Sequence, residues 1–112
     1  MDTFTLTIIF LLIGFMEIIL GIPLLLEKVK PNWIYGFRLP KTLSNKEIWY
    51  KTNKYAGRDL IVSGMIVTLG SLFLLTLSGS VSFDLIVFIG VLLIVVPVVL
   101  VLVRGLIYLK KL

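Results

Sequence analysis

One acidic side chain stands where the surrounding residues are apolar. Glu17 is the only charged residue in the run from Phe4 to Leu26. An ionisable group inside a bilayer costs roughly 3 kcal/mol on insertion scales, so Glu17 is expected to face other helices and to be neutral or paired. Two interpretations stay open: a ligand, ion or proton site, and a hydrogen-bonded structural carboxyl. Gly14 and Gly21 share its helical face, which would let a second helix approach closely.

Three arginines are candidates for binding an anion or a backbone oxygen. Arg38 can bind several carbonyls or a carboxylate at once with its planar guanidinium, or a lipid phosphate, and spacing does not separate these roles. Arg58 precedes Asp59 at the start of an apolar run, so both are expected in the membrane interface. Arg104 can extend to the aqueous surface or turn inward to pair with Glu17.

The composition excludes several kinds of chemistry. The chain has no cysteine and no histidine, which removes thiol nucleophiles, disulfides, imidazole bases and the common zinc sites. We therefore expect no metal site and no cofactor. Several polar residues would lie near lipid headgroups, but they form no visible nucleophile–base pair, which disfavours a membrane enzyme acting on lipid or peptide. These residues are Asn32, Arg38, Thr42, Glu47 and Asn53.

The elements that must position these residues are transmembrane helices. Of the 112 residues, 59% are hydrophobic and 15% are charged, whereas soluble domains have about 45–50% and about 25%. Apolar runs cover residues 4–26, 60–77 and 85–109. About 20 apolar residues in a helix cross the hydrocarbon core of about 30 Å. The sequence predicts an all-α integral membrane protein, a single module with three transmembrane helices.

The basic residues predict the orientation. All 11 Lys and Arg residues lie between the first and second runs or at the end of the third. The positive-inside rule then predicts a plasma-membrane protein with its N-terminus outside and its C-terminus in the cytoplasm. The basic face would attract anionic lipid headgroups, and we expect no binding to nucleic acid. Faces of small residues along the helices favour self-association, so a homo-oligomer is a further expectation.

The predicted cytoplasmic loop, residues 27–59, differs from the rest of the chain because aromatic and basic residues alternate in it. Such residues suit the headgroup layer. The stretch from Ser44 to Glu47 has the capping-box pattern, and apolar residues recur after it at helical spacing. We expect a short amphipathic helix, residues 45–56, lying in the membrane plane. Gly57 would permit a bend into the second span.

The polar and glycine residues of this loop resemble a known signature. The pattern N-x-x-x-G-x-R-x-P-x-T, followed by a tryptophan and a glycine, is similar to that of the SdpI family of membrane proteins. The resemblance implies a small membrane module that confers immunity to a membrane-active peptide toxin. It further implies a signalling role, with a regulatory protein as a partner. It implies a functional or structural role for the matching residues, which are Asn32, Gly36, Arg38, Pro40, Thr42, Trp49, Gly57 and Arg58.

An alternative function is proton-coupled export. A chain of this length with one Glu in its first span superficially resembles small multidrug transporters, in which that side chain would exchange protons. Those proteins have four spans and short loops, whereas this sequence predicts three spans and a long structured loop. Immunity is therefore the favoured hypothesis, and export through Glu17 is its main competitor.

Overall fold

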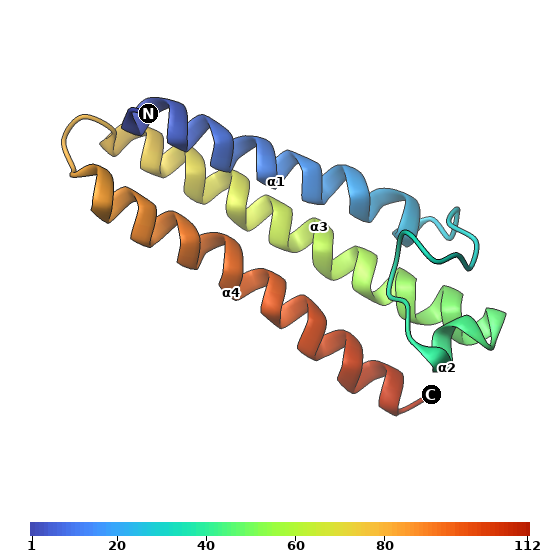
Figure 1. Ribbon diagram of the computed structural model, residues 1–112. Helices are drawn as coiled ribbons and strands as arrows, with labels where there is room; N and C mark the ends of the chain where they lie inside the picture. The colour runs from blue at the N-terminus through green and yellow to red at the C-terminus, as the bar shows by residue number, and fades with distance from the viewer.

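The computed structural model describes all 112 residues and contains four helices joined by loops. They are α1 (Thr3–Leu25), α2 (Pro40–Leu43), α3 (Lys46–Leu77) and α4 (Phe83–Lys110), and the three long helices lie roughly side by side (Figure 1). Each long helix is long and apolar enough to cross a membrane. The predicted all-α membrane fold is therefore confirmed. The molecule is elongated, with extents of 51 × 22 × 19 Å.

Helices α1 and α3 are antiparallel and touch through glycines. A Cβ atom on Gly14 would lie 2.8 Å from the backbone nitrogen of Thr68, and one on Gly64 would lie 2.7 Å from the carbonyl oxygen of Gly14. Nearer the other end, a Cβ atom on Gly21 would lie 2.7 Å from the carbonyl oxygen of Gly57. The predicted close approach at the face of Gly14 and Gly21 is confirmed. The two backbones meet because no side chain separates them.

Helix α4 has buried residues near both of its ends, and its apolar cluster lies at the end that holds the N-terminus. Phe10, Leu74 and Ile86, one from each long helix, form the buried apolar cluster there. The ring of Phe10 occupies the space beside Gly90 and leaves no room there for a Cβ atom. Most large apolar side chains of α4 remain exposed in the isolated chain. In a bilayer those side chains would meet lipid tails.

The structure corrects one prediction, which concerns the start of α3. Residues 45–56 were expected to form a separate helix in the membrane plane, with a bend at Gly57. They are helical from Lys46, but the helix runs through Gly57 without a break to Leu77. Gly57 serves packing instead, because a Cβ atom there would lie 2.7 Å from the Cβ of Leu24. The capping-box pattern implies Ser44 as the N-cap of this helix. The N-cap is instead Asn45, whose side chain accepts from Ile48 N–H at 3.1 Å.

At 32 residues, α3 is about 48 Å long, well above the roughly 30 Å of hydrocarbon that a spanning helix must cross. Its first turns therefore extend beyond the apolar zone. The segment between α1 and α3 folds against these turns, and the C-terminus lies at the same end (Figure 1). We call residues 28–45, which include α2, the cap.

Candidate functional site

The cap is held on α3 by two buried side chains. Trp49 is 0% exposed, and its indole N–H donates to the carbonyl of Val29 at 2.8 Å. One turn later Asn53 is also buried, donating from its amide nitrogen to the Trp49 carbonyl at 3.0 Å. Its amide oxygen accepts the backbone N–H of Phe37. Two positions of one helical face thus fix both ends of the cap's irregular stretch.

Within the cap, Asn32 builds a tight turn around itself. Its side-chain oxygen accepts from the backbone N–H groups of Ile34 at 2.9 Å and Tyr35 at 2.7 Å. Its side-chain nitrogen donates to the carbonyls of Lys30 at 2.7 Å and Tyr35 at 3.1 Å. The turn leaves Trp33 and Ile34 outside, exposed by 79% and 86%. A rigid turn therefore presents two large apolar side chains to the surroundings.

Gly36 and Thr42 complete the fold of the cap. Gly36 has φ +118°, and a Cβ atom there would lie 2.9 Å from the Asn53 side-chain oxygen and 3.0 Å from the Trp49 ring. Only glycine satisfies both the backbone angle and the contact. Thr42 is 0% exposed, and its hydroxyl accepts from Leu39 N–H at 2.9 Å and lies 2.8 Å from the Phe37 carbonyl. Pro40 begins α2, where a missing N–H is harmless.

The cap also contacts the two other long helices. Lys41 donates from its ammonium nitrogen to the carbonyl of Leu109 at 2.9 Å, at the end of α4. The ring of Phe37 lies against Gly105, where a Cβ atom would be 2.7 Å from it. The phenol of Tyr35 donates to the carbonyl of Leu20 in α1, and partial burial raises the pKa of Tyr35. The cap therefore joins all three helices at one end.

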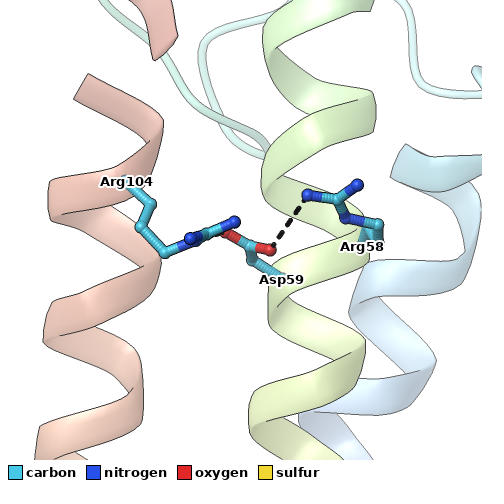
Figure 2. Close-up of polar contacts among 3 residues, drawn as sticks. All are labelled: Arg58, Asp59 and Arg104. Carbon is cyan, nitrogen blue, oxygen red and sulfur yellow. Dashed lines mark hydrogen bonds and ion pairs between the residues drawn. The ribbon is translucent and has the colours of Figure 1, made fainter. Parts of the chain in front are cut away.

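A charged cluster lies beside the cap, between α3 and α4. Asp59 accepts from Arg104 Nε at 2.7 Å, and its other oxygen lies 3.7 Å from Arg58 Nη2. The two guanidinium groups approach the carboxylate from different helices, Arg58 from α3 and Arg104 from α4 (Figure 2). Arg104 therefore pairs with Asp59 and not with Glu17. The Asp59 side chain is only 11% exposed, while both arginines are about half exposed.

Two tyrosines extend the charged cluster. The rings of Tyr55 and Tyr108 stack with centroids 4.3 Å apart, which joins α3 to α4 a second time. The Arg58 and Arg104 guanidinium carbons lie 5.0 Å and 5.5 Å from the centroid of the Tyr55 ring. Both distances fall within the range of cation–π attraction. Contact with the Tyr55 ring thus positions the two arginines and leaves N–H groups of each free to donate to a further acceptor.

Beyond this cluster a groove runs between α3 and α4. Its volume is about 550 Å³, and one end is charged while the walls are apolar. We call it the α3–α4 groove. It is lined by Arg58, Asp59, Val62, Ser63, Ile66, Val96, Pro97, Leu100, Val101 and Arg104.

Glu17 lies deeper, between α1 and α3. It is 5% exposed, and its Oε1 accepts from the hydroxyl of Ser63 at 3.1 Å. Its Oε2 is buried and has no hydrogen-bond partner. The expectation that Glu17 faces other helices is confirmed. Since Ser63 also lines the α3–α4 groove, one hydroxyl separates the buried carboxyl from that groove.

A sequence model of the SdpI/YfhL protein family matches residues 28–103. The matched range covers more than half of the chain and includes the cap, all of α3 and most of α4. The chain belongs to the SdpI/YfhL family. No curated protein and no solved structure matches it.

The match to the SdpI/YfhL family confirms the resemblance read from the loop. The cap and the first turns of α3 bring several predicted site residues together, namely Asn32, Gly36, Pro40, Thr42 and Trp49. Glu17 and Arg104 lie outside the matched range, and the hydrogen-bond partner of Glu17 is Ser63 of α3, which is not part of the cap. Arg38 is exposed, and its guanidinium donates to the Trp33 carbonyl within the cap.

Three residues of this SdpI/YfhL chain were not among the predicted site candidates. Asn53 organises the cap, Asp59 holds the two arginines, and Ser63 is the partner of Glu17. Asn53 follows Trp49 by one helical turn, so helical spacing from the tryptophan was a signal for it. Asp59 was visible only as a neighbour of Arg58. For Ser63 no signal existed, because its role depends on how α1 and α3 are aligned.

Proposed function

We propose that this SdpI/YfhL family chain is an immunity module that protects a cell from a membrane-active peptide toxin. The family match is the observation that carries the proposal, because it spans the cap and the helices that hold it. The positive-inside rule favours a cap at the cytoplasmic face. A peptide that inserts into the bilayer would meet the cap in the headgroup layer of that leaflet.

The turn around Asn32 supports a recognition role for the cap. Asn32 belongs to the family signature, and both polar atoms of its side chain form hydrogen bonds within the turn. The tip of this turn consists of Trp33 and Ile34. Arg38, a second signature residue, donates to the carbonyl of Trp33. Because hydrogen bonds already hold the backbone of this turn, contact through its two large apolar side chains orders less of the chain on binding, which favours contact with an apolar partner. In this proposal Asn32 and Arg38 act by positioning, and Trp33 with Ile34 makes the contact.

The test is a toxin challenge of cells that express the chain at matched membrane levels. Wild type is expected to raise the inhibitory concentration of a purified membrane-active peptide, and Trp33→Ala is expected to lower that protection about tenfold, as for a lost contact of about 1.4 kcal/mol. Asn32→Ala should have a similar effect, because the turn loses its order. Thr76→Ala is the matched control, since its exposed hydroxyl only donates to the carbonyl of Phe73.

Absence of protection by wild type against every peptide tried would contradict the proposal. Full protection by Trp33→Ala would leave immunity intact but remove the cap tip as the contact. Each outcome therefore addresses a different part of the proposal.

Proton-coupled export remains the second candidate, and one observation favours it. The buried Oε2 of Glu17 has no partner, and Ser63 connects the carboxyl to a groove. Glu17→Gln keeps a side-chain oxygen that can accept from the Ser63 hydroxyl, but it removes the carboxyl group that could exchange a proton. Loss of protection in Glu17→Gln, together with proton-dependent efflux of the peptide from vesicles by wild type, would favour export. Protection by Glu17→Gln equal to wild type would favour immunity through binding.

A further inference from the structure

We propose that the α3–α4 groove binds one anionic phospholipid, with an acyl chain along its apolar walls and the phosphate at Arg58 and Arg104. This site is separate from the turn at Asn32 on which the immunity proposal depends. The two proposals can therefore fail independently of each other.

The length of the groove fits one acyl chain. From Arg58 to Ile66 on α3, and from Val96 to Arg104 on α4, each helix rises about 12 Å at 1.5 Å per residue. One leaflet contributes half of a hydrocarbon core of about 30 Å, or about 15 Å. The apolar walls thus extend from the charged end through most of one leaflet. A chain lying in the groove would have its headgroup at the level of the arginines.

The charges at the end of the groove favour an anion. Arg58 and Arg104 share a single carboxylate, Asp59, and each is about half exposed. A second cavity of about 310 Å³ adjoins the groove at Arg58, and Lys54, which makes no ion pair, lines it. The two cavities are lined by four cations and two carboxylates, namely Lys51, Lys54, Arg58, Arg104, Glu27 and Asp59. A third carboxylate, that of Glu47, pairs with Lys51 at 3.0 Å, which leaves an excess of one cation.

The exposure of the walls favours a lipid as the occupant. Val62, Ile66, Val96 and Leu100 line the groove and are all exposed at the surface of the isolated chain. In a bilayer this surface faces lipid tails, so a lipid can enter sideways without opening the helices. A phospholipid carries a long apolar chain and a phosphate in one molecule. This combination matches the apolar walls and the excess of cations at their end.

The experiment is native mass spectrometry of the purified full chain in mild detergent. The probes are phosphatidylglycerol and phosphatidylcholine with identical acyl chains, offered at equal concentration. Wild type is expected to retain phosphatidylglycerol in preference to phosphatidylcholine. Arg58→Gln and Arg104→Gln should each lower the retention of phosphatidylglycerol about fivefold, the effect of one basic residue near a membrane surface.

Two further variants separate the groove from general attraction to positive charge. Lys110→Gln/Lys111→Gln removes two cations at the exposed C-terminal end, outside the groove, and should keep the wild-type preference. Leu100→Trp fills the groove and leaves every charge in place, so it should lower retention of both lipids. Leu100 is 54% exposed, so the larger side chain does not disturb a packed core. If circular dichroism shows that the arginine variants do not fold, Leu100→Trp decides whether the lipid binds in the α3–α4 groove.

Equal retention of the two lipids by wild type would overturn the proposal. So would a loss in the C-terminal lysine variant as large as that in the arginine variants, or wild-type retention by Leu100→Trp. A final arm offers an apolar peptide with a free terminal carboxylate. Retention of that peptide with no retention of phosphatidylglycerol would assign the groove to a peptide and overturn the lipid proposal.

Discussion

At the scale of single residues, amide side chains order the cap at the polar end of the molecule. Asn32 and Asn53 each donate from the side-chain nitrogen and accept with the side-chain oxygen. An amide can satisfy backbone N–H and C=O groups at once, which an irregular segment near a membrane needs because these groups find few other partners. Thr42 acts in the same way with its buried hydroxyl. These three side chains help to order the cap, together with the Trp49 contact described above.

Replacing Asn53 tests this role. In Asn53→Ala the backbone N–H of Phe37 loses its partner, whereas the Trp49 carbonyl still accepts its helical N–H in α3. Leaving one such group unpaired costs about 1–3 kcal/mol, so local opening of the cap should become at least about fivefold easier. Hydrogen exchange at the Phe37 amide measures this opening. Asn53→Asp keeps the acceptor and should protect Phe37 better than Asn53→Ala does.

Unchanged exchange at Phe37 in Asn53→Ala would show that other contacts hold the cap. Exchange within the intramembrane half of α3 serves as the internal reference, because no contact of Asn53 reaches it.

At the scale of elements, the glycines of α1 and α3 decide how the helices pack. Gly14 and Gly64 bring the two backbones together near the level of Glu17, and Gly21 with Gly57 does so near the cap. The hydrogen bond between Glu17 and Ser63 lies between these two contacts. The close approach therefore places a short polar side chain of α3 within reach of the buried carboxyl.

Adding one methyl group at this contact is expected to be costly. In Gly64→Ala the new Cβ atom would lie 2.7 Å from the carbonyl oxygen of Gly14 and 2.9 Å from the backbone nitrogen of Ile18, so the helices must separate. Overpacking of this kind costs about 1–3 kcal/mol. Gly70→Ala is the matched control on the same helix, because its Cβ atom would meet only the flexible end of Leu93.

Unfolding in detergent, followed by circular dichroism, compares the two variants. Equal stability of Gly64→Ala and Gly70→Ala would contradict the role assigned to the glycine contact.

The elements also show what could be predicted from the sequence. The long apolar runs predicted the three helices, and the shared face of Gly14 and Gly21 predicted a close helix contact there, because length and spacing follow from local geometry. Which helix makes that contact was not predicted. The predicted bend at Gly57 was wrong, because glycine suits a bend and a close helix contact equally well and the sequence does not separate the two. For Arg104 the sequence left open extension to the aqueous surface or pairing with Glu17, and it did not predict Asp59 as the partner, because the relative height of α3 and α4 is a tertiary property. The folding of the cap onto Asn53 is also a tertiary property, so the sequence did not predict it.

At the scale of the whole molecule, the cap and the C-terminus lie at one end and the N-terminus at the other (Figure 1). Lys41 in the cap contacts the carbonyl of Leu109 directly, so these segments share one side of any membrane that the three helices cross. All the Lys and Arg residues lie in the cap, in the first turns of α3, at the end of α4 or directly after it. The structure thus gathers the basic residues at a single end.

Single cysteines can test the orientation, because the natural chain has none. Lys41→Cys and Lys111→Cys are expected to react only after the cytoplasmic side becomes accessible to an impermeant maleimide. Ser80→Cys, in the loop between α3 and α4, is expected to react from outside. Labelling of Lys41→Cys and Lys111→Cys from opposite sides would contradict the three-span topology, and reaction of both from outside would reverse the orientation.

The uninterrupted length of α3 has a mechanical consequence. Both α1 and α4 contain a proline, but α3 has none, and nothing along it interrupts the helix. A molecule that pulls on the cap would pull on Trp49, and α3 would shift as one unbroken helix along its glycine contacts with α1. Displacement at the water boundary would then reach Ser63, and with it the acid group in the interior, without any change in secondary structure.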